Sequence, residues 1–260
     1  MASHPNLIET FRPPASAPLA RPGPLEVKLG HHLPLTYAER DALRALERRE
    51  RFVEPGETVV REGASTSRIY VVASGWLHAS TRLRDGGRQI LRFHFVGDLM
   101  GDGPLAWSKA TASLTAVSAC VLYEVEPSAL ARVFRDHPRL AALLYAIGAS
   151  DQVAMAQRLT SVGRTDALHR IGTLLLELRD QLAIVDGESG SVFELPLTLQ
   201  DLGDATGLTK THAGRTLRKL EEDGLLERDG RVLRILDVAR FAALVDYAQL
   251  PARLETRWMG

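Results

Sequence analysis

The sequence has very little cysteine. Cys120 is its single thiol among 260 residues. One thiol cannot form an intrachain disulfide, a four-cysteine zinc site or a four-cysteine iron–sulfur cluster. No apolar run reaches the roughly 18 residues that span a bilayer. The N-terminus also lacks the basic segment and apolar core of a secretory signal. We therefore expect a cytoplasmic protein with no membrane segment.

Net charge is also absent, because 32 Lys and Arg residues balance 32 Asp and Glu residues. A neutral chain gives no global argument for binding nucleic acid, so any such argument has to be local. The composition, 45% hydrophobic and 25% charged, is that of an ordinary folded protein. The length leaves room for two domains.

The N-terminal part divides into a leader and a helix. The first 25 residues hold six of the thirteen prolines and show no periodicity. This composition is typical of a disordered leader, which we place at residues 1–30. Residues 35–53 then have the apolar spacing of a short amphipathic helix.

From Pro55 onward, turn signals recur about every ten residues between short apolar runs, which is typical of an all-β sandwich or roll. Residues 76–83 and 88–97 flank Asp85-Gly86-Gly87 and predict a hairpin. Alternation in the second run predicts a strand with one buried face. Residues 112–125 predict two further short strands.

Helical periodicity follows, beginning near Pro138, and predicts a helix at residues 137–162. A helix of about 23 residues is roughly 35 Å long and usually buries an apolar stripe. The stripe either packs on its own domain or forms a two-stranded dimer seam. We favour the seam because a separate domain begins next. The predicted seam residues are Leu140, Leu143, Leu144, Ile147 and Ala154.

The C-terminal part, from residue 163, reads as a helix at 167–182, a strand pair around 191–197, two short helices and a hairpin. Asp229-Gly230 between apolar runs predicts the turn of that hairpin. The two short helices meet at Gly207. Thr198 with Asp201 forms a weak capping box for the first.

Thr209 can cap the second of these helices, in which Ala213, Leu217 and Leu220 share one apolar face. Basic residues occupy the opposite face, and residues 205–220 contain no acid. A carboxylate there would be repelled by DNA phosphates, whose neutralisation supplies much of the affinity. The pattern matches a helix-turn-helix, and arginine can bond guanine bidentately. The candidate DNA-binding residues are Thr209, Lys210, Thr211, His212, Arg215, Arg218 and Lys219.

A solvated basic helix face is the structural alternative. The hairpin that follows, a natural wing against the DNA backbone, makes that alternative less favoured.

The order of roll, long helix and winged helix-turn-helix resembles the CRP/FNR (cyclic AMP receptor / fumarate-nitrate regulator) family. The segments EPGETVVREGASTSRIYVVASGWL, FVGDLMGDG and GLTKTHAGRTLRKLEEDGLL carry the resemblance, which covers about residues 55–235. It implies an α+β fold with a cyclic-nucleotide-binding-like β-roll. The implied divisions are an effector domain with its leading helix at 31–136, a dimerisation helix at 137–162, a winged helix-turn-helix domain at 163–248 and a tail at 249–260.

The resemblance implies a homodimeric transcription regulator that is not an enzyme. Its recognition helix, residues 209–221, would enter the major groove of a near-palindromic double-stranded operator. RNA polymerase is an expected partner. In the family, two recognition-helix positions read guanine and an intervening glutamate reads cytosine. Lys210, Thr211 and Arg215 stand at these positions, so the preferred site should depart from the best-known ones, with Arg215 as the guanine reader.

The resemblance also implies an effector pocket in the roll. The family's Gly-Glu-Leu segment becomes Gly101-Asp102-Gly103, and its Arg-Ser phosphate clamp becomes Ala110-Thr111, with Lys109 one residue early. The long-helix pair that reads adenine aligns near Met155-Ala156. Losing the arginine removes a bidentate phosphate clamp, so another effector, or none, is favoured over cyclic AMP. The candidate pocket residues are Gly101, Asp102, Lys109 and Thr111.

Four other classes of protein are weighed against this interpretation. Haem-binding relatives direct attention to His31-His32, His78 and His94, although histidines are more often surface or satisfied residues than ligands. The missing cysteine cluster argues against iron–sulfur sensing. A cupin-like enzyme would need a His-x-His pair, which His94 lacks. The main alternative is a cyclic-nucleotide sensor that regulates a protein partner, against which the basic surface at 210–218 argues.

Overall fold

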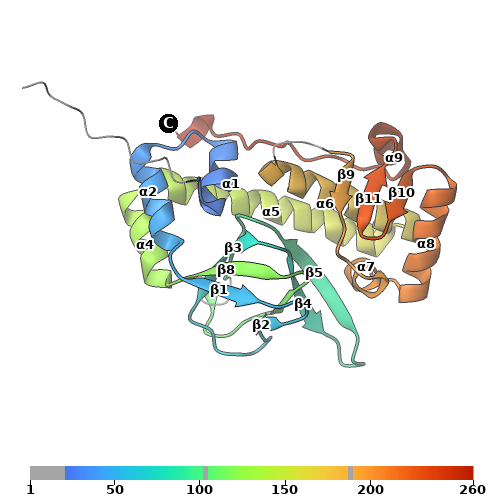
Figure 1. Cartoon of the computed structure of the whole chain (residues 1–260), viewed down its shortest axis with the longest axis horizontal. Coiled ribbons are helices and arrows are strands. Elements are labelled where there is room, and N and C mark those ends of the chain that lie inside the picture. The colour runs from blue at the N-terminus through green and yellow to red at the C-terminus, as the bar shows by residue number, and fades with distance from the viewer. Residues whose placement is uncertain (1–20, 102–104, 187–189, 260) are drawn as a thin grey trace, which may run out of the picture.

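The computed structural model describes residues 21–101, 105–186 and 190–259. Figure 1 shows a β-roll beneath a long helix, α5 (Pro138–Arg164), which leads into a C-terminal group of helices and strands. The α+β architecture predicted from the sequence is confirmed.

The roll consists of two four-stranded sheets with strand orders β1-β8-β3-β6 and β2-β7-β4-β5. Val72, Leu77 and Leu122 form part of the apolar cluster of the roll. The predicted hairpin is β4–β5, and the two predicted later strands are β7 and β8, so both predictions are confirmed. The strands are β1 (Glu50–Val53), β2 (Thr58–Val60), β3 (Ile69–Ser74), β4 (Leu77–Arg82), β5 (Arg88–His94), β6 (Leu99–Met100), β7 (Ser113–Ala116) and β8 (Cys120–Val125).

Two N-terminal helices correct the sequence predictions. Residues 24–30, assigned to a disordered leader, belong to α1 (Pro24–His32), because Pro24 suits a first helical turn and Leu25 and Leu29 are buried four residues apart. Residues 1–20 of the leader lie outside the described residues. The helix predicted over 35–53 ends at Leu46 as α2 (Tyr37–Leu46), since Glu50–Val53 pairs with β8 instead.

The C-terminal domain begins with α6 (Ala167–Asp186) and contains a three-stranded sheet of order β10-β11-β9. The strand pair predicted around 191–197 is a single strand, β9 (Val192–Glu194), whose partner is β11. The predicted hairpin is confirmed as β10 (Leu226–Asp229) and β11 (Val232–Ile235), with Gly230 at φ 58° in its turn. The remaining helices are α7 (Leu199–Thr206), α8 (Lys210–Glu222) and α9 (Val238–Leu244).

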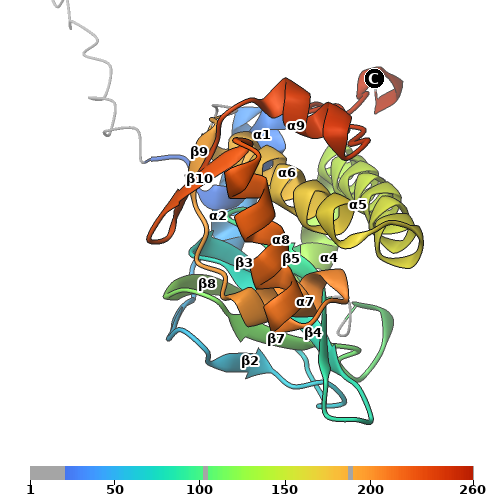
Figure 2. The same ribbon diagram turned by 90° about the vertical axis from the view of Figure 1, so that its right-hand side faces the viewer.

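The C-terminal domain packs on the outer face of the roll. Ile90, Phe93 and Phe95 belong to the same apolar cluster as Leu174 of α6 and Leu217 of α8. A register shift between Ala79 and Ser80 lets Ile90 and Phe93, an odd number of positions apart, join the same cluster. Figure 2 shows α7 beside β5.

The C-terminal segment returns to the N-terminal helices, as Figure 1 shows. Leu254 and Met259 pack against the cluster that contains Leu25 and Leu29. His31 Nε2 lies 2.9 Å from the carbonyl oxygen of Ala252. The tail therefore connects the C-terminal domain to helix α1.

Within the part of the chain that the structure describes, no helix combines the length and apolar character needed to cross a membrane.

Candidate nucleic-acid interface

Helix α8 is fixed at its start and along its inner face. The Thr209 hydroxyl accepts a hydrogen bond from the His212 amide at 3.2 Å, as the sequence predicts for the helix cap. Ala213, Leu217 and Leu220 are at most 1% exposed. This burial orients the helix, so its other face has to point away from the domain.

That other face carries the predicted basic residues. Lys210, Thr211, Arg215 and Arg218 are all exposed. Thr211, Arg215 and Arg218 lie on the side of α8 opposite the buried leucines, and Lys210 lies in the first turn of the helix. Thr209 and His212, also predicted contacts, are exposed beside them in the first turn. The helix therefore presents cationic groups that can bond phosphates or the edges of guanine.

Two acids at the end of α8, Glu221 and Asp223, have cationic partners. Glu221 forms an ion pair with Arg228 of β10 at 2.8 Å, and Asp223 with Lys219 at 2.7 Å. Neither carboxylate is left uncompensated near the basic face. Lys219, a predicted DNA contact, already has Asp223 as a partner and would have to exchange it for a phosphate.

The first helix of the pair, α7, is set by its cap and by two glycines. The Asp201 amide donates to the Thr198 hydroxyl at 3.1 Å, and the Thr198 amide donates to the Asp201 carboxylate at 2.9 Å. The predicted capping box is thus present. Gly207 ends the helix at φ 67°, a left-handed conformation suited to glycine. Gly203, which the sequence prediction missed, lets α7 approach the chain beyond the turn, since an added Cβ would lie 2.6 Å from the Leu208 carbonyl oxygen.

The long helix α5 places the predicted seam residues in different environments. Leu140 and Leu143 are fully buried in the chain's own core, so their assignment to a dimer seam is wrong. Leu144 and Ile147 are half-buried against the same cluster, and Ala154 is half-buried beside a small cavity. The N-terminal half of the apolar stripe therefore packs on its own domain.

A different stripe of α5 is exposed. Tyr145 and Leu159 are 75% and 74% exposed, far more than apolar side chains usually are. They belong to a set spaced alternately by four and three residues, which is the spacing of a two-stranded coiled coil. The set comprises Tyr145, Ala149, Gln152, Ala156, Leu159 and Gly163, all exposed.

A cavity of about 380 Å³ lies between the roll and α5. Tyr70, Met100 and Tyr145 contribute to its wall. Three of its cationic side chains already pair with carboxylates. These pairs are Arg92 with Asp151 at 2.7 Å, Lys28 with Asp98, and Arg68 with Glu126. Burial raises the pKa of Asp98, but Lys28 and His94 outweigh this effect and hold the pKa well below its usual range.

Two family models match the chain: the cyclic nucleotide-binding domain at residues 50–137 and the Crp-like helix-turn-helix domain at residues 169–244. The nitrogen fixation regulation protein FixK of Bradyrhizobium diazoefficiens is 30% identical over 210 residues, which cover 81% of this chain and 87% of that protein. The chain belongs to the CRP/FNR family of transcription regulators. The resemblance identified from the sequence motifs is confirmed.

Other members of the family are also similar to this chain. The transcriptional activator protein FnrA of Stutzerimonas stutzeri is 27% identical over 212 residues, covering 82% of this chain and 86% of that protein. The solved structure of FixK2 from Bradyrhizobium japonicum superposes with a TM-score of 0.67 and 26% identity, covering 78% of this chain and 98% of that one. The chain is thus a CRP/FNR-type regulator with a helix-turn-helix DNA-binding domain.

The family's effector positions are only partly reproduced in the cavity. Gly101 and Thr111 line it, as predicted. Lys109 does not belong to its wall and is exposed, because its backbone bridges to Ser65 at the edge of the roll. Asp102 lies outside the described residues. Met155 and Ala156, with which the adenine-reading pair aligns, do not line the cavity, since α5 reaches it with residues 141–151.

The four histidines weighed as haem ligands are dispersed. His94 lines the cavity, with Nδ1 3.6 Å from Asp98, whereas His78 contacts Arg88 on the outer face of β4. His31 and His32 lie on α1. Among the described residues, no group of three or more His, Cys, Asp or Glu side chains is placed to hold a metal ion.

Proposed function

We propose that this regulator acts as a homodimer in the cytoplasm and binds a near-palindromic operator with α8 in the major groove. The exposed basic face of α8, held outward by its buried leucines, is the observation that carries the proposal. The exposed heptad stripe of α5 supplies the pairing surface. Two recognition helices one DNA turn, about 34 Å, apart would then read two half-sites. RNA polymerase is the partner that such a regulator would contact at a promoter.

Arg215 is the side chain proposed to read guanine. The operator is first selected from a random DNA library with the wild-type protein. Affinity for it is then measured by fluorescence anisotropy at fixed salt. We expect Arg215→Ala to lose about 1–3 kcal/mol of binding free energy and to relax the base preference at one position of each half-site. Arg135→Ala, an exposed arginine of α4 (Pro127–Asp136) far along the chain from α8, is the matched control and should bind normally. Unchanged affinity and base preference in Arg215→Ala would refute the role.

We further propose that the cavity of the roll receives a small effector other than cyclic AMP. The support is its chemistry: Lys28, Arg68 and Arg92 are each engaged by a carboxylate, and the family's phosphate-clamping arginine is replaced. Mass spectrometry of the protein purified from its native cells should release a bound molecule. Saturable binding of cyclic AMP by titration calorimetry would contradict the exclusion of that nucleotide.

A further inference from the structure

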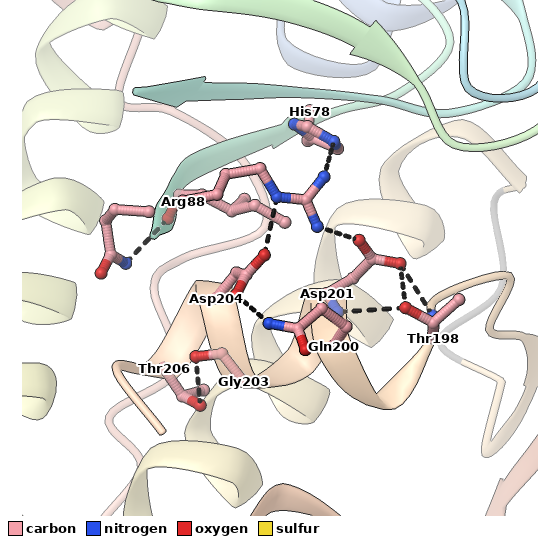
Figure 3. Close-up of polar contacts among 10 residues, drawn as sticks. His78, Arg88, Thr198, Gln200, Asp201, Gly203, Asp204 and Thr206 are labelled. Carbon is pink, nitrogen blue, oxygen red and sulfur yellow. Dashed lines mark hydrogen bonds and ion pairs between the residues drawn. The ribbon is translucent and has the colours of Figure 1, made fainter. Parts of the chain in front are cut away.

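The C-terminal domain, called the winged domain from here on, is joined to the roll by a polar cluster as well as by apolar packing. Figure 3 shows the Arg88 guanidinium, from β5, aimed at two carboxylates of α7. Its Nε donates to Asp204 at 2.7 Å, and its Nη2 donates to Asp201 at 2.5 Å. A third nitrogen, Nη1, lies 3.2 Å from His78 Nε2. All three guanidinium nitrogens thus have a partner, two in α7 of the C-terminal domain and one in β4 of the roll.

The charge states favour this arrangement. Burial, and next to it the Arg88 charge, lower the pKa of His78 from 6.5 to about 4, so its ring is neutral and accepts the hydrogen bond from Arg88. Burial lowers the pKa of Arg88, but the hydrogen bonds to Asp204 and Asp201 outweigh it and raise the pKa overall. The side chains of Asp201 and Asp204 are 15% and 9% exposed.

Geometry makes the cluster an orienting device. The two carboxylates lie three residues apart, on one face of α7, and a planar guanidinium that holds both restricts rotation as well as distance. Gln200 donates to the free oxygen of Asp204 at 2.6 Å, and the other oxygen of Asp201 is held by the Thr198 cap. Because α7 leads through Gly207 into α8, fixing α7 on the roll fixes the recognition helix too.

The same two strands also reach the effector cavity. Ala79, Arg92 and His94 line it, whereas Arg88 bonds to the winged domain and His78 contacts Arg88. A displacement of β4 or β5 by a bound effector would therefore reach the cluster directly.

We propose that Arg88 is a positioning residue: its bridge to Asp201 and Asp204 sets the angle of the winged domain on the roll and thereby the separation of the two recognition helices in the dimer. The inference rests on the proposed dimeric DNA binding. A dimer whose winged domains are held rigidly on the rolls should bind full sites with one particular spacing between the half-sites. It should bind sites with a longer or shorter spacing much more weakly.

The test measures anisotropy binding curves on a single half-site and on full sites whose central spacer is lengthened or shortened by up to about half a DNA turn. The spacing profile is the affinity for the full site as a function of spacer length. In Arg88→Glu we expect unchanged affinity for the half-site and roughly tenfold weaker binding to the optimal full site. We also expect the spacing profile to be flatter than that of the wild type. The double variant Arg88→Glu with Asp204→Arg should restore the profile. Asp204 is used because Asp201 also caps α7. Arg84→Glu, the same charge change at an exposed position of the same hairpin, is the matched control.

Asp204→Asn gives a second route if Arg88→Glu does not fold, since it removes the partner charge with little change of shape, and it should flatten the profile too. An unaltered spacing profile in these variants, or tighter full-site binding, would overturn the role of Arg88. If the wild type itself binds full sites no better than half-sites, the proposed dimeric recognition fails instead, so the two failures are distinguishable.

Discussion

At the scale of the residue, the basic face of α8 was predictable because its determinants are local. The spacing of Ala213, Leu217 and Leu220 fixes which face is buried, and their burial leaves Thr211, Arg215 and Arg218 outside. Arg88 was not predictable, because its partner Asp201 lies 113 positions away along the chain. No periodicity within either segment reports such a pairing.

His78 makes folding stability depend on pH. Its pKa is about 4 in the folded chain against 6.5 ordinarily, and His32 is lowered to the same value, first by burial. Between these pH values the unfolded chain binds more protons, so stability is full above pH 6.5 and falls as the pH drops toward 4. From pH 6.5 to 5.5 we expect each of these histidines to cost about 1 kcal/mol of unfolding free energy.

The measurement is urea unfolding at both pH values. His78→Asn should lose about 1 kcal/mol less than the wild type over this interval, whatever its stability at neutral pH. Gln249→Asn, at an exposed residue that does not titrate, should keep the wild-type difference. The same pH dependence in wild type and His78→Asn would show that His78 does not titrate in this way.

At the scale of the element, the predicted α7–turn–α8 unit is confirmed by its caps at Thr198 and Thr209. The long helix shows where periodicity fails. Its leucine stripe was predicted to form a dimer seam, but the structure assigns Leu140 and Leu143 to the chain's own core. Tyr145 and Leu159 are separated by two heptads, and this less obvious repeat was the sequence signal for the exposed face.

Gly203 sets the close approach within the helix-turn-helix. An alanine Cβ there would lie 2.6 Å from the Leu208 carbonyl oxygen, so the backbone has to shift. We expect Gly203→Ala to lower the unfolding free energy by about 1–3 kcal/mol, measured by urea unfolding. Gly30→Ala, in a helix where an added Cβ meets nothing within 4 Å, should be neutral or stabilising by up to about 1 kcal/mol. Equal stability of the two variants would contradict this assignment.

Leu159 lies in the exposed stripe proposed to pair two protomers. A glutamate there would bring like charges together across the seam and remove apolar contact. Analytical ultracentrifugation should show wild-type dimers and predominantly monomers of Leu159→Glu at micromolar concentration. Arg132→Glu, on the exposed surface of α4, should remain dimeric. A dimer that persists in Leu159→Glu would place the interface elsewhere.

At the scale of the whole molecule, the order of roll, long helix and winged domain was readable from the sequence, since each part has its own periodicity and turn spacing. The way the parts pack was not readable. The alternation of Phe93 and Phe95 predicted a buried face, yet these rings belong to the cluster of the winged domain. Leu254 and Met259 likewise return to α1, which proline content had assigned to a leader. Both contacts join residues far apart in sequence.

The central claim is that two copies of α8 read one DNA site. Hydroxyl-radical footprinting of the selected operator, with the wild-type protein, tests it most directly. We expect two protected segments per strand, related by two-fold symmetry and centred about 10 base pairs apart, and their loss in Arg215→Ala at the same protein concentration. A single asymmetric footprint, or symmetric protection that Arg215→Ala leaves intact, would contradict the claim.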